Sequence, residues 1–408
     1  MSKLVINGAK ELSGYIDVSG SKNAALPIIF STVITCGSSV LYGVPDIGDV
    51  RVALSLIKDM GAHVVREGDA LYINTEKLVY SVHNEHLVSS IRASSYLLGA
   101  DLARFGRARL QNFGGCNFEF RPIDMHIYAM RALGAVEDGK FMRAEKLLGG
   151  DIRFDKKSVG ATVNAIIMSA TAEGVSRIFG YAREPHVCSL IDFLVSCGAD
   201  ITLYDEYIEI KGRELHGGCA RIIPDMIEAG TYLVISALSG GKVSVRGADT
   251  SHIASLISLL RSSGFFVGER GDGIYADGVP VKPINVITSP YPGFPTDLQP
   301  QMAPLLAFFC GGSICERVWH SRFAYLEELK KFGIESERFG DTAHILPSKI
   351  QSASVNAVDL RAGAAMVICA LFARGESVVN SSELVGRGYE KFVEKLSSIG
   401  ADIIEIES

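Results

Sequence analysis

The chain has 408 residues, 48% hydrophobic and 21% charged, a composition that excludes intrinsic disorder as its main state. The formal net charge of −6 argues against a nucleic-acid binder that relies on bulk positive charge. No apolar run reaches the roughly 20 residues of a membrane span, and no secretory signal is visible over residues 1–14. We therefore expect a cytoplasmic protein. At about 150 residues for each domain, the length of the chain predicts two to three domains.

One pattern of predicted elements recurs along the chain: an amphipathic helix, a glycine and then an alternating strand. The pattern predicts helices over 52–60, 127–133 and 190–197. The glycines that end the six copies are Gly61, Gly134, Gly198, Gly264, Gly333 and Gly400. Their spacing of 64 to 73 residues indicates six repeated units of about 68 residues.

Each unit also contains an earlier helix, followed by a glycine-containing turn and a strand. Helices are predicted over 24–35, 160–172 and 362–373, and the glycines after them are expected at the left-handed C′ position. Residues 243–246 alternate as a strand, and 201–204 with 207–210 read as a strand pair. This alternation of helices and strands predicts α/β layers, although a repeat array is equally compatible with a non-catalytic binding scaffold.

Polar residues stand before the first helix of each unit. Helix N-capping is one interpretation, and it suits Ser158, Thr296, Asp297 and Asp359. However, the positive end of a helix disfavours cations, and Lys22, Arg92 and Arg361 occupy such positions. Three cations at equivalent helix starts therefore favour a shared anion site.

Arginines also dominate the loops that follow the second strand of each unit. Arg121, Arg183, Arg322 and Arg387 stand there. If equivalent loops project to one end of each domain, this acidic protein has a basic cleft suited to a small polyanionic substrate.

Cys116 differs from the other cysteines, because it lies in a Gly-Gly loop five residues before Arg121. Neighbouring guanidinium groups lower the pKa of a thiol, so we expect Cys116 to be reactive. The other seven cysteines are interpreted as buried, reduced thiols: Cys36, Cys188, Cys197, Cys219, Cys310, Cys315 and Cys369.

Together these motifs resemble the UDP-N-acetylglucosamine enolpyruvyl transferases, a branch of the enolpyruvyl transferase superfamily. The resemblance runs from Leu4 to the C-terminus. It rests on Ser19-Gly-Ser-Lys22-Asn23-Ala-Ala-Leu-Pro, Gly114-Gly-Cys116, Arg121-Pro-Ile-Asp124-Met-His, Ser158-Val-Gly-Ala-Thr162, Ala182-Arg-Glu-Pro, Ile227-Glu228-Ala-Gly-Thr, Phe294-Pro-Thr-Asp297-Leu-Gln, Asp359-Leu-Arg361 and Arg387-Gly-Tyr-Glu390. The sister branch that acts on shikimate 3-phosphate lacks the Gly-Gly-Cys loop.

The resemblance implies a two-domain inside-out α/β barrel, classed as α+β in some schemes, with three helix/strand repeats in each domain. Residues 1–20 and 226–408 would form one domain, which the first β segment completes. Residues 21–225 would form the other and carry the Cys116 loop as a lid. Both substrates would bind in the cleft, which closes on them.

The implied reaction moves the enolpyruvyl group of phosphoenolpyruvate to the 3-hydroxyl of UDP-N-acetylglucosamine and releases phosphate. This transferase would catalyse the first committed step of peptidoglycan synthesis by addition and then elimination. Such a reaction needs an acid and a base that exchange protons, together with cations for the phosphate and the carboxylate.

The same resemblance implies roles for individual residues. Asp297 would be the base at the sugar hydroxyl, and Cys116 would be a proton donor or an aid to product release. Lys22, Arg121 and Arg387 would hold the phosphoryl group. Arg322 and Arg361, with Arg92, would hold the carboxylate, and Asp359 would support a neighbouring cation. The residues expected to contact the nucleotide sugar are Asn23, Arg121, Pro122, Ile123, Asp124, Met125, Lys156, Ser158, Val159, Gly160 and Val318.

The resemblance implies no metal, organic cofactor, nucleic acid or membrane. A phosphonate epoxide that mimics phosphoenolpyruvate is expected to alkylate Cys116. The chain departs from the family pattern at Met226, His320, Gly386, Gly48 and Phe118-Glu119-Phe120. None of these departures removes a proposed catalytic group.

Three alternatives remain open. A paralogue would transfer enolpyruvyl to another nucleotide or sugar, and a repeat scaffold would bind a partner without catalysis. A zinc site built from Cys310, Cys315 and His320 lacks the usual ligand spacing. His83 and His86 are interpreted as a solvated turn.

Overall fold

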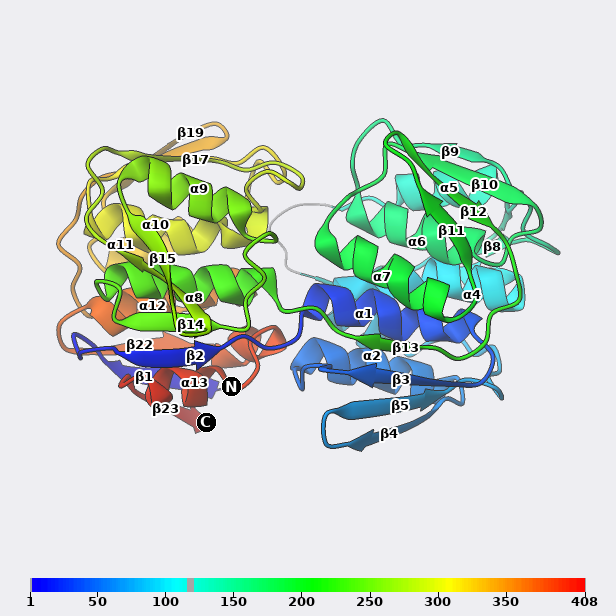
Figure 1. Ribbon diagram of the computed structural model, residues 1–408, viewed down its shortest axis with the longest axis horizontal. Helices are drawn as coiled ribbons and strands as arrows, with labels where there is room; N and C mark the ends of the chain where they lie inside the picture. Colours follow the sequence, from blue (N-terminus) through cyan, green and yellow to red (C-terminus); the bar gives the residue numbers. More distant parts are fainter. Residues whose placement is uncertain (1, 116–120, 408) are drawn as a thin grey trace. The chain divides into compact units, whose positions relative to one another are not determined.

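The protein has a mixed α/β fold, seen in a computed structural model that describes residues 2–115 and 121–407. The chain divides into two compact units (Figure 1). The first comprises residues 2–19 and 224–407, and the second comprises residues 20–115 and 121–223. The predictions that concern Cys116 and residues 118–120 fall outside the described residues.

Three helices form the core of the first unit: α8 (Met226–Leu238), α10 (Gln299–Phe308) and α12 (Leu360–Phe372). α10 packs against both of the others. Every residue of α12 from Leu360 to Leu371 is buried. A helix that is buried on all sides must be covered on all sides, and sheets supply that cover.

The described strands of the first unit form three four-stranded sheets. Their orders are β21-β22-β1-β23, β15-β16-β14-β2 and β17-β18-β20-β19. In each sheet one pair of neighbours is parallel and the other pairs are antiparallel. The strands are β1 (Ser2–Asn7), β2 (Gly14–Asp17), β14 (Val243–Arg246), β15 (Phe266–Arg270), β16 (Gly273–Asp277), β17 (Ile284–Ile287), β18 (Gly312–Cys315), β19 (Ser336–Phe339), β20 (Thr342–Ile345), β21 (Ser354–Asn356), β22 (Glu376–Asn380) and β23 (Asp402–Glu407).

The N-terminal strands belong to sheets that are otherwise built from the C-terminal half of the chain. β1 lies between β22 and β23 and is antiparallel to both, with Leu4 opposite Val379 and Glu405. β2 pairs in parallel with β14. Residues 2–17 therefore complete two sheets of the first unit.

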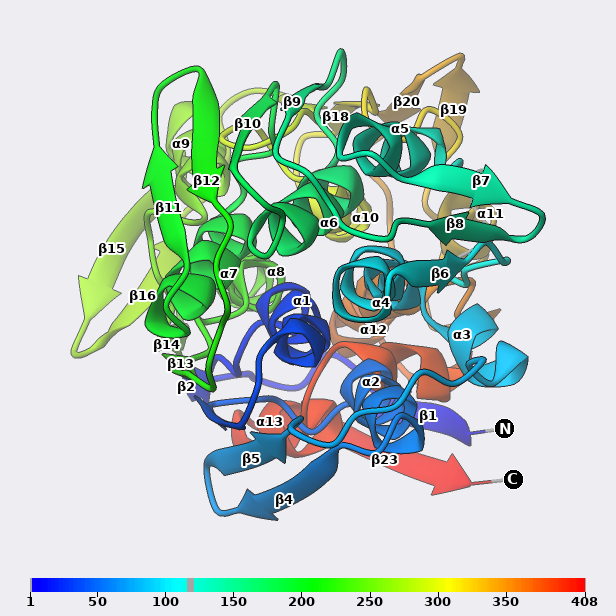
Figure 2. The ribbon, with the colours of Figure 1, turned by 90° about the vertical axis from the view of Figure 1, so that its right-hand side faces the viewer.

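The second unit is built in the same manner around α1 (Lys22–Ser31), α4 (Leu97–Phe105) and α6 (Val159–Ser169). Figure 2 shows its sheets around these helices. The sheet orders are β13-β3-β5-β4, β9-β10-β12-β11 and β6-β8-β7. The strands are β3 (Ser38–Tyr42), β4 (His63–Glu67), β5 (Ala70–Asn74), β6 (Arg107–Arg109), β7 (Val136–Asp138), β8 (Phe141–Arg143), β9 (Asp151–Arg153), β10 (Val175–Phe179), β11 (Asp200–Leu203), β12 (Tyr207–Lys211) and β13 (Cys219–Arg221).

All but one of the remaining α-helices connect two strands of the same sheet. The α-helices are α2 (Gly48–Asp59), α3 (Glu85–Ser90), α5 (Asp124–Ala132), α7 (Pro185–Ser196), α9 (Ala254–Ser263), α11 (Tyr325–Lys331) and α13 (Phe392–Ser398). The 3₁₀ segments are η1 (Thr32–Ile34), η2 (Arg92–Tyr96), η3 (Thr296–Leu298) and η4 (Ser382–Arg387).

The repeated glycines have the backbone conformation that their positions require. The six glycines of the recurring pattern have φ between 85° and 110°, which favours glycine over residues with a Cβ. The prediction of a C′ position was wrong for Gly37, Gly174 and Gly375. α12, for example, ends at Phe372 and its C-cap is Ala373, so Gly375 lies farther along the turn, where its φ is still 100°.

Two further predictions about burial were wrong. Of the seven described cysteines, only Cys197 and Cys369 are buried; Cys36, Cys188 and Cys219 are exposed, and Cys310 and Cys315 are partly buried. Apolar neighbours in sequence did not show which face of an element meets solvent. His83 is buried rather than solvated, because its Nε2 lies 2.6 Å from Oδ2 of Asp101 on α4.

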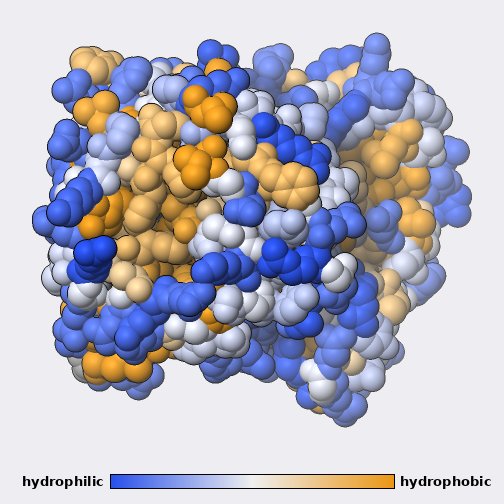
Figure 3. Space-filling view, turned by 60° about the vertical axis from the view of Figure 1, so that its left-hand side comes forward, coloured by the Kyte–Doolittle hydropathy of each residue, from blue (hydrophilic) through white to orange (hydrophobic). Residues whose placement is uncertain are grey.

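The surface in Figure 3 is mostly hydrophilic and is interrupted by an apolar area. Large apolar side chains exposed on the first unit include Phe266, Val281 and Phe339. No helix among the described residues is both long enough and apolar enough to cross a membrane.

Candidate active site

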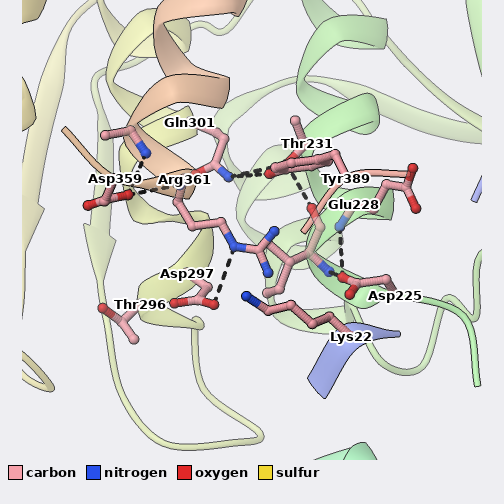
Figure 4. Close-up of polar contacts among 12 residues, drawn as sticks. Lys22, Asp225, Glu228, Thr231, Thr296, Asp297, Gln301, Asp359, Arg361 and Tyr389 are labelled. Atoms are coloured by element: carbon pink, nitrogen blue, oxygen red, sulfur yellow. Dashed lines mark hydrogen bonds and ion pairs between the residues drawn. The ribbon is translucent and has the colours of Figure 1, made fainter. Parts of the chain in front are cut away.

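Asp297 lies between two buried arginines in the first unit. Asp297 belongs to η3, directly before α10, whereas Arg322 follows β18 and Arg361 is the second residue of α12. Its Oδ1 lies 2.8 Å from Nη1 of Arg322. Its Oδ2 lies 3.4 Å from Nε of Arg361 (Figure 4). The Asp297 side chain is 31% exposed, against 4% for Arg322 and 1% for Arg361. The carboxylate is thus held by two guanidinium groups while it remains reachable from solvent.

The start of α12 fixes Arg361 through Asp359. Oδ1 of Asp359 accepts the backbone N–H groups of Arg361 and Ala362, each at 2.8 Å, so Asp359 is a helix N-cap. Ser158 caps α6 in the same way. The capping interpretation was wrong for Thr296 and Asp297, because Pro295 is the N-cap residue of η3 and both side chains face other partners.

The outer nitrogens of Arg361 are buried hydrogen-bond donors. Nη1 and Nη2 are buried, and neither has a hydrogen-bond partner among the described residues. Burial alone would lower the pKa of Arg361, but Tyr389, Asp297 and Asp225 outweigh it and raise the pKa. The guanidinium therefore stays charged with donors to spare, and an anionic ligand would satisfy them.

Glu316 is a buried carboxylate that sequence reasoning missed. It follows β18 and accepts four hydrogen bonds, from the hydroxyls of Thr288 and Thr296 and from two backbone N–H groups of the next loop. Its side chain also raises the pKa of Arg322, together with the larger effects of Asp297 and Asp359, against the lowering effect of burial. The available signal in the sequence was an acidic residue directly after a short strand.

A second polar network lies behind Arg361. The Arg361 guanidinium carbon is 5.1 Å from the centre of the Tyr389 ring. The Tyr389 hydroxyl hydrogen-bonds with Thr231 at 2.9 Å and with Gln301 at 3.1 Å (Figure 4). Arg387 ends η4, which packs against α12. The predicted cation Arg387 is therefore only two residues from the network that supports Arg361.

Lys22 and Arg92 begin helical segments of the second unit. Lys22 is the first residue of α1, and its Nζ lies 3.1 Å from Oδ2 of Asp49. Arg92 opens η2, where its Nη2 donates to the backbone oxygen of Arg121 at 2.8 Å. Burial lowers the pKa of Arg92. The two side chains lie at helix starts, as the sequence predicted.

The residues expected to contact the nucleotide sugar surround the starts of α5 and α6. Asn164 on α6 links these elements, because its Nδ2 lies 2.7 Å from Nδ1 of His126 on α5 and its Oδ1 accepts the N–H of Gly99 at 2.6 Å. A Cβ at Gly160 would lie 3.1 Å from the His126 ring, so glycine permits this close approach. The predicted residues in this region are Pro122, Ile123, Asp124, Met125, Lys156, Ser158, Val159 and Gly160, and Asn23 follows Lys22 on α1.

The structure has two other places where a site could be expected. A cavity of about 760 Å³ in the second unit is lined by Tyr80, Arg104, Arg107, Arg143 and Lys146 among others, and no predicted site residue lines it. In the described ranges, no three His, Cys, Asp or Glu side chains lie together as a metal site would require. The zinc alternative at Cys310, Cys315 and His320 therefore has no support from the described geometry.

Comparison with known proteins identifies the family. A family model described as EPSP synthase (3-phosphoshikimate 1-carboxyvinyltransferase) matches residues 6–396. The UDP-N-acetylglucosamine 1-carboxyvinyltransferase of Halothermothrix orenii is 41% identical over 415 residues and covers 100% of both chains. UDP-N-acetylglucosamine 1-carboxyvinyltransferase 3 of Caldanaerobacter subterraneus is 42% identical, again over 100% of both chains. The chain belongs to the UDP-N-acetylglucosamine 1-carboxyvinyltransferase family.

Solved structures support the enolpyruvyl transferase fold. The enolpyruvyl transferase NikO from Streptomyces tendae has a TM-score of 0.88 and 25% identity, with 100% of this chain and 99% of that chain covered. The EPSP synthase of Acinetobacter baumannii has a TM-score of 0.73 at 18% identity, and this likeness concerns the fold alone. Membership of the UDP-N-acetylglucosamine 1-carboxyvinyltransferase family rests on the full-length relatives, which are 41% and 42% identical to this chain.

Proposed function

We propose that the protein transfers the enolpyruvyl group of phosphoenolpyruvate to the 3-hydroxyl of UDP-N-acetylglucosamine, with release of phosphate, in peptidoglycan synthesis. The observation that carries this proposal is the Asp297 carboxylate held by Arg322 and Arg361. It supplies a base beside buried cations, as addition and elimination at an anionic substrate require. The names of the full-length relatives agree with this reaction.

Asp297 would accept the proton of the sugar hydroxyl as the oxygen attacks C2 of phosphoenolpyruvate. C3 receives a proton in the same addition, which gives a tetrahedral adduct. Elimination then removes a proton from C3 and expels phosphate, so the double bond is restored in the product. Both arginines donate hydrogen bonds to Asp297, and an ionised carboxylate is the form that accepts such bonds. The ionised form is also the form that can take up the hydroxyl proton, so Asp297 suits the role of base in the first step.

The cations would divide between the charged groups of phosphoenolpyruvate. Arg361, with two buried nitrogens lacking a described partner, would bind the carboxylate, assisted by Arg322 and Arg92. Lys22, Arg121 and Arg387 would hold the phosphoryl group. Asp359 supports Arg361 through the helix start that it caps. Asn23, Val318 and the α5 and α6 starts would contact the nucleotide sugar.

Cys116 would supply a thiol for proton donation or product release, although it lies outside the described residues. We propose that a phosphonate epoxide alkylates this thiol. Burial raises the pKa of Cys197 to about 11 and raises that of Cys369 further, so these two thiols are poor nucleophiles and serve as internal controls. Mass spectrometry should find one adduct, on the peptide that contains Cys116; an adduct only on other cysteines would contradict the assignment.

We also propose that the six described sheets represent six copies of one helix/strand repeat. Five of the six sheets have four strands that include one parallel pair, and the sheet β6-β8-β7 has three. The three buried helices of each unit support an inside-out barrel, in which sheets surround helices. The two domains would span residues 1–20 with 226–408, and residues 21–225.

Incubation with both substrates tests the proposed reaction. Purified protein should release phosphate only when phosphoenolpyruvate and UDP-N-acetylglucosamine are both present, and mass spectrometry should show the enolpyruvyl ether of the sugar nucleotide. Shikimate 3-phosphate in place of the sugar nucleotide is the control for acceptor choice. Absence of phosphate release with the sugar nucleotide would refute the proposal, and release with another acceptor would favour the paralogue.

A further inference from the structure

We propose that Glu316 is a positioning residue that sets the proposed base with one carboxylate oxygen and the nucleotide-sugar loop with the other. This inference rests on the proposed function, because it assigns consequences to Asp297 and Val318. Glu316 itself is not proposed to contact either substrate. It acts on Asp297 through Thr296 and Arg322, and on the loop through Thr288 and through direct bonds to two backbone N–H groups.

The oxygen Oε1 holds the loop that follows β18. It accepts the backbone N–H of Val318 at 2.8 Å and that of Trp319 at 2.9 Å. It also accepts the hydroxyl of Thr288 at 2.6 Å, and Thr288 Oγ1 in turn accepts the N–H of Arg317 at 2.8 Å. Three successive backbone N–H groups, from residues 317–319, are therefore fixed by the Glu316–Thr288 pair.

The oxygen Oε2 determines the direction of a hydrogen-bond chain that ends at Asp297. Oε2 accepts the hydroxyl of Thr296 at 2.8 Å. The only proton of the Thr296 hydroxyl is used in this bond, so Thr296 Oγ1 can only accept from other groups. It accepts a hydrogen bond from Nη1 of Arg322 at 3.1 Å. The same Nη1 donates to Oδ1 of Asp297 at 2.8 Å. Glu316 thus fixes the guanidinium that orients the proposed base.

An acceptor-only group is needed at this position. Glu316 is fully buried, and all four of its described hydrogen bonds come from donors. A glutamine would keep one oxygen for the loop but would present an amide N–H to Thr296, in competition with Arg322. The substitution should therefore disturb the Asp297 branch more than the loop branch.

Two threonine substitutions separate the branches. Thr296→Val removes the hydroxyl that links Glu316 to Arg322. Thr288→Val removes the hydroxyl that links Glu316 to the N–H of Arg317 and leaves the direct bonds of Glu316 to Val318 and Trp319. Thr296→Ser and Thr288→Ser keep the hydroxyls and are the conservative rescues. Thr202→Val, on the exposed side of β11 in the second unit, is the matched control.

Steady-state kinetics should split between the two branches. Thr296→Val should lower kcat about 10-fold and leave KM for the sugar nucleotide within about 3-fold, because the base is misaligned after binding. Thr288→Val should raise that KM about 10-fold and leave kcat within about 3-fold, because a loosened loop weakens ground-state binding. Glu316→Gln should resemble Thr296→Val, and both serine variants should recover to within about 3-fold of wild type.

Hydrogen exchange supplies a readout that does not need turnover. The amide of Arg317 should exchange at least about 10-fold faster in Thr288→Val, because it loses its acceptor, while the amides of α10 stay unchanged. If the wild type shows no turnover, the proposed function fails, and this exchange result alone decides whether Glu316 anchors the loop. Equal effects of both valine variants on kcat and KM, unrecovered activity in the serine variants, or unchanged exchange would each overturn the inference.

Discussion

Oδ1 of Asp297 and Nη1 of Arg322 lie 2.8 Å apart, and the arginine is buried while the carboxylate is partly exposed. Arg322 is therefore already desolvated before a ligand binds. The carboxylate of Asp297 keeps one side open to a substrate hydroxyl. This asymmetry is the basis of the first two predictions.

Asp297→Asn should abolish the proposed base while it preserves the shape of the side chain. We expect kcat to fall about 10²- to 10⁴-fold, the usual contribution of general acid–base catalysis, with KM for both substrates changed much less. Asp402→Asn, at an exposed ion pair with Lys10, is the control. A folded Asp297→Asn protein with wild-type kcat would contradict the base assignment.

Arg361→Lys tests the proposed contact with the substrate carboxylate. Lysine keeps the charge but loses the two-pronged donor geometry, so KM for phosphoenolpyruvate should rise about 10- to 100-fold, or about 1–3 kcal/mol. KM for the sugar nucleotide should change less. Arg246→Lys, at a surface ion pair with Asp17, should leave both constants unchanged. Equal changes in both KM values would argue for a general structural effect instead.

His126 predicts a pH dependence of stability. Burial, with a smaller effect of Arg92, lowers the pKa of His126 from 6.5 to about 4. In the unfolded chain this histidine gains a proton below about pH 6.5, whereas the folded protein resists it, so stability falls as pH drops from 6.5 towards 4. The loss attributable to this group is about 3 kcal/mol.

Urea unfolding at pH 7 and pH 5 measures this effect. The difference in unfolding free energy between the two pH values should be smaller in His126→Gln than in wild type. His63→Gln, at an exposed position of β4, should keep the wild-type difference. Parallel pH dependence in wild type and His126→Gln would show that the histidine does not titrate as expected.

Gly230 on α8 links helix packing to the position of Asp297. A Cβ at residue 230 would lie 2.5 and 2.7 Å from the two δ carbons of Leu298, the residue after Asp297. Gly230→Ala should therefore cost about 1–3 kcal/mol of stability and lower kcat as η3 shifts. Adding Leu298→Ala should restore part of the stability, measured by a double-mutant cycle in urea. Additive losses would show that the clash is relieved elsewhere.

The sequence alone allowed several helices and the glycines that follow them to be predicted, because buried helices and the glycines after them are local signals. Gly264 and Gly400, for example, have the left-handed conformation that the pattern required. Lys22, Arg92 and Arg361 were placed at helix starts for the same reason. The exposure of individual cysteines was not predictable, because it depends on which face of each element is covered.

Contacts between distant segments account for the rest. Glu316 accepts hydrogen bonds from Thr288, which directly follows β17, and from Thr296, the first residue of η3. Both threonines are distant from Glu316 in the sequence. His83 is buried because Asp101 on α4 supplies its partner. Sequence spacing does not show such pairings. The burial of His83 was therefore predicted wrongly, and Glu316 was not recognised as part of the site.

The placement of β1 between β22 and β23 has a consequence for synthesis on the ribosome. The last strand of the second unit, β13, ends at Arg221, so all of that unit's described strands are available while the rest of the chain is still being made. The first unit must leave residues 2–17 unpaired until their partners emerge, and its sheet is complete only once β23 has been translated. Translation order therefore favours early folding of the second unit, with the N-terminal strands joining the first unit last.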